Sequence, residues 1–403
     1  MRCVTLPTDS YRRGASLILV LIAIFTGCGG DDNGGGGTTN NTPPAGSTAN
    51  QFGYVINAGT NEIRAMTVDG TTGNLALVTG SSPIATGTLP HDVQVDRQGR
   101  YVYVANHESS FVSGWRINTD GSLTPINPST AGSPVTNLSG SDPTENRPHS
   151  SVMDKDGQHL YAVAGIGPAT LKAYQIQTAP GATQGTLTAM IGQSFAVGIH
   201  AHRVRMSPNG QFLYVAAEDS GEVYAFSRNP STGALTRSST PKLTGLSGAL
   251  DVQVDSQNKF LFASYINAVE VMSIGSDGSP TRISPVSAFS TNNNGQGSGP
   301  HAMVIHPNGQ SLYTANINAH TLTVFKVDPV SGVLTEVVPN PQTGADPNYV
   351  FIHPNGQILY SMDTAVSQVS KFTINGDGSL TGPEIIGSAI VGVGPNGIAT
   401  TNK

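Results

Sequence analysis

The feature that most constrains the fold of this chain is a unit of about 50 residues that recurs seven times. An aromatic residue occupies one equivalent position in every unit. Consecutive copies lie 47 to 58 residues apart, at Tyr54, Tyr103, Tyr161, Tyr214, Phe262, Tyr313 and Tyr360. A repeat of this length is typical of arrays in which each supersecondary unit buries its core against the next one. The chain is therefore expected to be a closed or stacked array of similar units.

Each unit carries the signals of four short strands. A run that alternates in polarity follows the aromatic strand, as in Val223-Tyr224-Ala225-Phe226. A hairpin signal comes next, such as Asp120-Gly121 or Asp377-Gly378, and a short Leu-Thr strand closes the unit. A further strand and turn precede each aromatic residue. Seven four-stranded units that stack on one another predict an all-β fold, a seven-bladed β-propeller.

The two ends of the repeat array predict how the ring closes. The first unit starts at Phe52 and lacks the strand that precedes the aromatic residue in the other units. The segment 394–400 matches that missing strand, but no further unit follows it. We therefore expect the C-terminal strand to pair into the first blade, which leaves no unpaired sheet edge at the junction.

Composition and charge exclude other classes of protein. Only 11% of the residues are charged, whereas the chain contains 48 Gly and 26 Pro. Helical bundles and coiled coils need many charged residues on their wet faces, so they are excluded. A formal net charge of −6 argues against nucleic acid as a partner, because nucleic-acid binders present a basic face.

The N-terminus has the pattern of an export signal. Arg2, Arg12 and Arg13 precede the apolar run 15–25, which is shorter than the roughly 20 residues that a membrane-spanning helix needs. The ending Phe25-Thr26-Gly27-Cys28 resembles a bacterial lipobox. We therefore predict a lipoprotein signal peptide over 1–27, lipidation of Cys28 and membrane attachment through that lipid. The alternative is ordinary secretion with an incidental cysteine.

Cleavage at this point has consequences for the mature chain. Residues 28–50, rich in Gly, Thr, Asn and Pro, would form a flexible tether with a reach of about 25 Å, and 51–403 would form the propeller. The formal charge changes from −6 to −8, because three Arg and one Asp are removed. The other cysteine, Cys3, is lost with the signal, so no thiol remains for a disulfide or a metal. A glycine follows Cys28, and resemblance to enterobacterial lipoproteins then implies the outer rather than the inner membrane of the cell envelope.

The repeat motifs resemble those of a known family. The pattern combines Pro-His-x-Val, Pro-x-Gly-x-x-Leu-Tyr-Val-Ala-Asn, x-Val-x-x-Phe and Thr-Gly-x-Leu-Thr. It is similar to that of the lactonase-type seven-bladed propellers, which include 6-phosphogluconolactonases and carboxymuconate-lactonising enzymes, and it covers roughly 52–403. A single Trp and the absence of a Trp-Asp pair argue against a WD40 array. The resemblance implies a lactone as the small-molecule substrate.

Candidate site residues occur twelve positions before the repeated aromatics. These positions begin the innermost strands, so in a propeller they ring one mouth of the central channel. They hold His91, His149, His202, Leu250, His301 and Asn348, and the final half-unit adds Asn396. Four histidines in seven equivalent positions indicate either a site or an inherited strand-capping hydrogen bond.

Basic and acidic residues gather near two of these histidines. Arg147 precedes His149 and matches an arginine that the family resemblance assigns to the site, while Arg203 and Arg205 follow His202. Loops after the second strands bring further polar residues to the same face: His107, Glu108, Glu218, Asp219, His320 and Asp363. Where the family often has Asp-Leu-Gly, this chain has Ala217-Glu218-Asp219, which displaces the acid.

Lactone hydrolysis needs a base for water and a cation for the substrate's anionic group. We predict His149 or His202 as the base, oriented by Glu218. The substrate-binding residues are then predicted to be Arg147, Arg203, His91, His301, Asn348 and Asn396. Arg203 and Arg205 have an equally open alternative, which is burial in ion pairs between blades. No metal site and no cofactor are expected.

Two functions remain open from the sequence. The first is an exported lactone hydrolase, for which an unphosphorylated or carboxylated lactone suits the compartment better than a sugar phosphate. The alternative is a non-enzymatic propeller of the cell envelope that binds a protein, a glycan or a small ligand. The letters Gly392-x-Gly394-x-x-Gly397 match a dinucleotide fingerprint, but no helix is expected to follow them.

Overall fold

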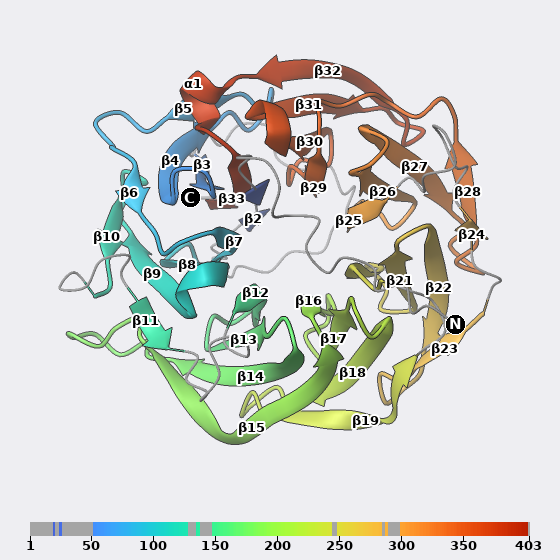
Figure 1. Ribbon diagram of the computed structural model, residues 1–403, viewed down its shortest axis with the longest axis horizontal. Coiled ribbons are helices and arrows are strands. Elements are labelled where there is room, and N and C mark those ends of the chain that lie inside the picture. The colour runs from blue at the N-terminus through green and yellow to red at the C-terminus, as the bar shows by residue number, and fades with distance from the viewer. Residues whose placement is uncertain are drawn as a thin grey trace, which may run out of the picture.

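The computed structural model describes residues 19–20, 24–25, 51–127, 134–137, 147–243, 248–283, 287–288 and 299–401. In this part of the chain seven sheets are arranged around a central axis (Figure 1). The blades are antiparallel, and in the second to seventh blades the first strand in the chain is the innermost one. The prediction of an all-β, seven-bladed propeller with four-stranded blades is confirmed. The predicted signal peptide, Cys28 and the tether lie outside the described residues, apart from two dipeptides.

The blades are built in chain order. The second blade contains β7 (Pro90–Val95), β8 (Tyr101–Asn106), β9 (Phe111–Ile117) and β10 (Leu123–Pro125). The third contains β12 (Pro148–Met153), β13 (His159–Ala164), β14 (Pro168–Ile176) and β15 (Leu187–Ile199). The fourth contains β16 (Ala201–Met206), β17 (Phe212–Ala217), β18 (Glu222–Arg228) and β19 (Leu235–Leu243). The fifth blade contains β20 (Asp251–Val254), β21 (Phe260–Tyr265), β22 (Ala268–Ile274) and β23 (Pro280–Arg282). The sixth contains β25 (Pro300–Ile305), β26 (Ser311–Asn316), β27 (Thr321–Val327) and β28 (Leu334–Val337). The seventh contains β29 (Pro347–Ile352), β30 (Ile358–Asp363), β31 (Gln368–Ile374) and β32 (Leu380–Ile386).

The first blade is shared between the two ends of the propeller. It contains β33 (Pro395–Thr401), β3 (Gln51–Asn57), β4 (Glu62–Val68) and β5 (Leu75–Leu77). β33 pairs antiparallel with β3, and Tyr54 lies opposite Ala399 in the register. The predicted closure by the C-terminal strand is therefore confirmed, and it occupies the inner edge that the first blade would otherwise leave open.

Shorter elements are added to this frame. They are the strands β1 (Leu19–Val20), β2 (Ile24–Phe25), β6 (Ile84–Ala85), β11 (Pro134–Asn137) and β24 (Ser287–Ala288), the 3-10 helices η1 (His107–Ser109) and η2 (Thr364–Val366), and the helix α1 (Ser388–Val391). β1 and β2 both pair with β33. Among the described residues we find no helix with the length and apolar character needed to cross a bilayer.

The repeated aromatic residues hold neighbouring blades together. All seven are fully buried. In six blades the tyrosine hydroxyl donates a hydrogen bond to the hairpin glycine carbonyl of the next blade: Tyr54 to Gly121, Tyr103 to Gly185, Tyr161 to Gly233, Tyr214 to Gly278, Tyr313 to Gly378 and Tyr360 to Gly73. These glycines adopt positive φ angles that favour glycine. The repeated aromatic residue of one blade is therefore bonded to the hairpin glycine of the next blade at six of the seven interfaces. At the remaining interface the aromatic residue is Phe262, which has no hydroxyl.

Apolar side chains fill the space between blades, which explains the low charge content. One core cluster, for example, joins Tyr161 and Val163 of the third blade to Leu213 and Val215 of the fourth. Most strands bury both faces against neighbouring blades, so few strand positions remain for charged residues. The inner strands and their loops are consequently held on a rigid frame.

Candidate functional site

The candidate residues lie at the beginning of the innermost strands, as their sequence positions predict. His91, His149 and His301 are each the second residue of their strands, directly after a proline. Proline has no N–H to donate to a sheet, so it is tolerated at the start of an edge strand. The Pro-His step therefore places each of these imidazoles at the second position of an innermost strand.

Three of the four ring histidines connect adjacent blades by hydrogen bonds. His91 Nδ1 lies 3.0 Å from the carbonyl oxygen of His149. His202 Nδ1 contacts the Leu250 carbonyl at 2.9 Å, and His301 Nδ1 contacts the Asn348 carbonyl at 2.9 Å. Because a carbonyl can only accept, Nδ1 carries the proton in each ring and Nε2 keeps its lone pair. These bonds give the repeated histidine an architectural role.

The two asparagines of the ring are buried as well. Asn396 is fully buried and its amide donates to the carbonyl of Pro90, which continues the blade-to-blade pattern across the closure. Asn348 is 3% exposed, and its side-chain oxygen has no hydrogen-bond partner. Both residues therefore belong to the wall beside the histidines.

His149 departs from the pattern of the other ring histidines. Its Nε2 lies 3.2 Å from Nε2 of His200, which precedes β16 and adopts a positive φ of 55°. Its Nδ1 is buried and has no hydrogen-bond partner. A buried polar atom without a partner is costly in a structural role, so this nitrogen is a candidate for direct contact with a ligand.

Six histidines from the second, third, fourth and sixth blades form one cluster. They are His91, His107, His149, His200, His202 and His301. The ring centroids of His149 lie 4.2 Å from His107, 4.7 Å from His91 and 4.7 Å from His200. His301 joins the cluster through His202, at 4.9 Å between centroids.

Burial keeps the four ring histidines, His91, His149, His202 and His301, uncharged at neutral pH. Burial lowers the pKa of His149 well below its ordinary value, and the neighbouring histidines lower it further. Burial and the charge of Arg203 lower the pKa of His91 in the same way. The pKa of His301 falls to about 4 for the same two reasons. Neutral imidazoles keep a lone pair, so these rings can accept protons or bind a cation.

Glu218 reaches the cluster through His200. Its Oε2 lies 3.3 Å from His200 Nδ1, and Asp219 Oδ1 lies 3.6 Å from the same nitrogen. Burial raises the pKa of Glu218. The sequence predicted that Glu218 orients His149 or His202. The structure inserts His200 between them and forms the series Glu218–His200–His149.

Arg147 lies on the more exposed side of the cluster. Its guanidinium contacts Glu108 Oε1 at 2.8 Å, and the same oxygen is 3.4 Å from His107 Nδ1. His107 in turn packs on His149. Arg147 is therefore linked to the cluster by two contacts, and part of its side chain stays exposed.

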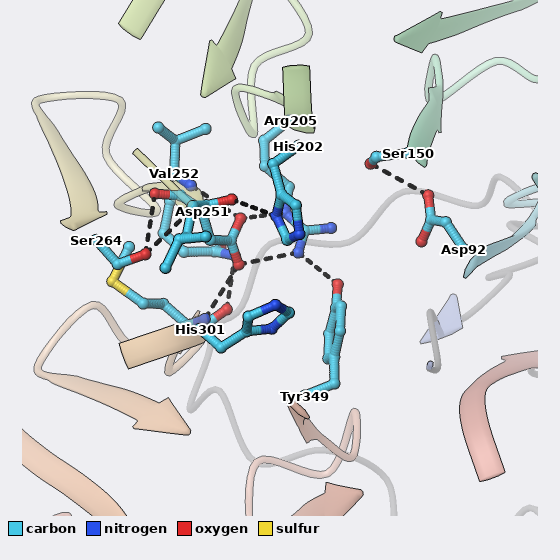
Figure 2. A network of polar contacts seen from close by, with 12 residues as sticks. Asp92, Ser150, His202, Arg205, Asp251, Val252, Ser264, His301 and Tyr349 are labelled. Carbon is cyan, nitrogen blue, oxygen red and sulfur yellow. Dashed lines mark hydrogen bonds and ion pairs between the residues drawn. The ribbon is translucent and has the colours of Figure 1, made fainter. Parts of the chain in front are cut away.

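Charged side chains form a second layer beside the histidines; Arg203 and Arg205 follow His202 along β16, and Asp251 begins β20. Arg205 forms two contacts of 3.2 Å with the Asp251 carboxylate, and it also donates to the Tyr349 hydroxyl (Figure 2). Arg203 is 0% exposed, and its guanidinium stacks 4.7 Å above the Tyr349 ring. Arg205 thus takes the inter-blade ion-pair role that was left open. Arg203 is enclosed in the same layer and has no direct opening to solvent.

Residues 36–345 match the model of the family described as lactonase, seven-bladed β-propeller. The chain belongs to this lactonase family. The match covers most of the chain, and the description of the family agrees with the seven blades described above.

Proteins similar to this lactonase-family chain include a named relative and solved structures of the same fold. A 6-phosphogluconolactonase of Bacillus subtilis is 26% identical over 289 residues, which span 69% of this chain and 76% of the relative. The solved structure of a periplasmic gluconolactonase from Pseudomonas aeruginosa shares the fold at a TM-score of 0.69 and 16% identity, over 87% of this chain and 98% of that one. A solved Bacteroides fragilis protein aligns at a TM-score of 0.68 and 20% identity, over 89% and 99% of the two chains.

Sequence reasoning missed one member of this lactonase-family cluster entirely. His200 lies outside the repeated position, and only its spacing of two from His202 could have drawn attention to it. His107 was expected near the site and is part of the cluster. Two other loop residues lie elsewhere: His320 approaches Asp346 at 4.0 Å, and Asp363 bonds to Ser370 of its own blade.

Proposed function

We propose that this lactonase-family protein is an exported, lipid-anchored lactone hydrolase whose active site is the histidine cluster at one mouth of the central channel. The observation that carries the proposal is the unpartnered Nδ1 of His149 at the end of the Glu218–His200–His149 series. His149 is a buried base whose Nδ1 can accept a proton, and the Glu218 carboxylate orients it through His200. Activation of water requires such an oriented base.

The proton positions follow from the contacts. The Glu218 carboxylate favours the tautomer of His200 that carries its proton on Nδ1, so Nε2 of His200 becomes an acceptor. His149 then donates its Nε2 proton to His200 across 3.2 Å. The lone pair of His149 therefore resides on Nδ1, the atom without a partner.

In the proposed reaction, His149 Nδ1 takes a proton from water while the water oxygen attacks the lactone carbonyl carbon. Collapse of the tetrahedral adduct breaks the ring carbon–oxygen bond, and the proton passes to the departing alkoxide. Arg147 binds an anionic group of the substrate, because its guanidinium is partly exposed and adjacent to the cluster. His91, His202 and His301 shape the wall of the site.

The substrate class follows from the compartment. An exported protein meets few sugar phosphates, which are made and kept in the cytoplasm, so we favour an unphosphorylated or carboxylated lactone. The Pseudomonas aeruginosa relative is described as a periplasmic gluconolactonase, which supports this class. The name of the Bacillus subtilis relative supports a phosphorylated lactone instead, so both belong in the test.

The test is hydrolysis of a panel of lactones by the purified protein, measured as acid release above the spontaneous rate. We expect turnover of a carboxylated lactone, whose carboxylate Arg147 can bind, with His149→Gln lowering kcat by about 100-fold to 10,000-fold. Glu218→Gln should lower kcat and remove the rise of activity with pH that follows ionisation of Glu218. His306→Gln is the matched control, because His306 contacts Gly356 outside the cluster.

Two results would contradict this function. One is the absence of turnover for every lactone while circular dichroism shows folded protein. The other is full activity of His149→Gln. The export part is tested separately by Cys28→Ser, which should abolish lipid labelling and release the protein from the outer-membrane fraction.

A second function has an observation in its favour. His91, His202 and His301 all make hydrogen bonds to the next blade, which an architectural ring in a binding propeller would also need. If His149→Gln and Glu218→Gln abolish capture of a glycan, small ligand or envelope protein while no lactone is ever cleaved, the protein is a binding module.

A further inference from the structure

Three imidazoles of the cluster converge closely enough to hold one ion. One ring nitrogen from each of His91, His149 and His202 lies within 4.8 Å of the other two. Zinc binds imidazole nitrogen at about 2.0–2.1 Å, and tetrahedral geometry then keeps such nitrogens about 3.4 Å apart. Side-chain movements of about an ångström would therefore close the three nitrogens around an ion.

The hydrogen bonds of these rings are those of metal ligands. A ligating histidine usually donates its other ring N–H to a carbonyl or carboxylate, which fixes its tautomer and orientation. His91 and His202 do so, to the carbonyls of His149 and Leu250, and both keep a lone pair on Nε2. His149 has a buried Nδ1 with no partner. Every ring of the set therefore retains one nitrogen able to bind a cation.

The surroundings allow a cation. The three residues belong to β7, β12 and β16, the rigid inner strands of three consecutive blades. The charge of Arg203 opposes a further positive charge at His91 and His202, and the carboxylates of Asp92 and Asp251, which interact with Arg203 and Arg205, offset it in part. Burial lowers the pKa values of His91 and His202, so protons compete little for the ligand nitrogens at neutral pH.

We propose that His91, His149 and His202 form a binding site for a divalent transition metal of the kind that prefers imidazole, with zinc as the probe. Neutral nitrogen donors suit zinc, copper or nickel rather than magnesium or calcium, which take oxygen ligands. Three protein ligands leave a fourth position open for water or another ligand. The three histidines were already candidate site residues from the sequence, but no metal was expected there, because they come from three different repeats and the predicted propeller has no cysteine ligand.

This site goes beyond the proposed function and is measured without substrate. A ring nitrogen that binds a metal has no lone pair left for a proton, so metal binding and the base role of His149 compete for that ring. Failure of lactone hydrolysis therefore says nothing about zinc binding, and failure of zinc binding leaves the hydrolysis proposal intact.

The experiment is a zinc titration of purified protein that carries no histidine tag, by calorimetry after dialysis against chelator. We expect one equivalent of zinc to bind, and magnesium and calcium to give no heat. Cobalt should give the visible absorption of a tetrahedral complex. His202→Gln should weaken zinc binding at least about 100-fold, because loss of an outer-shell partner alone costs 10-fold to 100-fold.

His301→Gln is the matched control. His301 has the same ring position and the same hydrogen bond to the next blade, but it is not among the three convergent ligands. We expect its zinc affinity to remain within about threefold of the parent. A second control, Glu218→Gln, addresses the nearby group of His200, Glu218 and Asp219.

Three results would overturn the assignment. The first is an absence of bound zinc in folded protein. The second is an equal loss in His202→Gln and His301→Gln, which would assign the effect to disruption of the ring. The third is a loss in Glu218→Gln with none in His202→Gln, which would place the ion at the carboxylates. If His202→Gln does not fold, His91→Gln supplies the same comparison.

Discussion

The tyrosine hydroxyl that links each blade to the next makes a measurable contribution to stability. Tyr214 is fully buried, and its hydroxyl donates a 2.9 Å hydrogen bond to the buried carbonyl of Gly278. Tyr214→Phe removes the donor and keeps the ring. Phe262 provides a natural counterpart, because its blade already lacks this hydroxyl.

The expected magnitude follows from the two groups involved. A neutral hydrogen bond contributes about 0.5–1.5 kcal/mol net, and a buried carbonyl left without a partner costs about 1–3 kcal/mol. The ring itself stays packed, so no cavity is added. We therefore expect Tyr214→Phe to lower the free energy of unfolding by about 1–2 kcal/mol. Phe262→Tyr should raise it by about 0.5–1 kcal/mol if the new hydroxyl reaches the Gly332 carbonyl.

Urea denaturation followed by circular dichroism and by tyrosine fluorescence measures both changes. The slope of the free energy against urea should be unchanged, because the surface exposed on unfolding is the same. Coincident transitions with the two probes justify the comparison. A change of less than about 0.3 kcal/mol in Tyr214→Phe would refute the reasoning, since it would mean that water replaces the lost donor.

Two further predictions concern buried charges and protons. Arg205→Met should destabilise the protein by about 3–5 kcal/mol in urea denaturation, because it leaves the fully buried Asp251 without its cation, and Asp251→Asn in the same chain should restore part of the loss. His301 has a pKa of about 4 in the folded protein, so below the ordinary value of about 6.5 the unfolded chain binds a proton that the folded one does not. The free energy of unfolding should therefore fall as the pH drops from about 6.5 to about 4. His301→Gln should reduce this slope by up to about 1.4 kcal/mol per pH unit, and identical slopes in the two proteins would contradict the assignment.

Much of the architecture was predictable because it is repeated in the sequence. The spacing of Tyr54 to Tyr360 predicted seven blades, and the unmatched segment 394–400 predicted the closure with β3. Repeats make such inference strong, since each blade packs against a neighbour with the same pattern of inward-facing residues. The repeated position also located His91, His149, His202 and His301 at the inner strands.

The site was only partly predictable, because the repeat shows which positions are equivalent but not what each side chain contacts. Equivalent positions in the sequence are not equivalent in chemistry: His91, His202 and His301 bond to the next blade, while His149 faces His200 and leaves Nδ1 unpartnered. Glu218 is in the expected loop but contacts His200 instead of a ring histidine. The spacing of two between His200 and His202 does not predict the contact between His200 and Glu218. That contact depends on the turn at His200, where the chain reverses between β15 and β16.

By itself, then, the sequence determined the number of blades, their strand order and the polar character of the inner strand ends, because these depend on periodicity within one chain segment. Only the tertiary structure decided which side chains meet across blades: Tyr214 with Gly278, Arg205 with Asp251, and His91 and His202 with His149. These contacts join residues 46 to 64 positions apart in the chain. Their geometry depends on the rotation between neighbouring blades, which ring closure sets for all seven blades together.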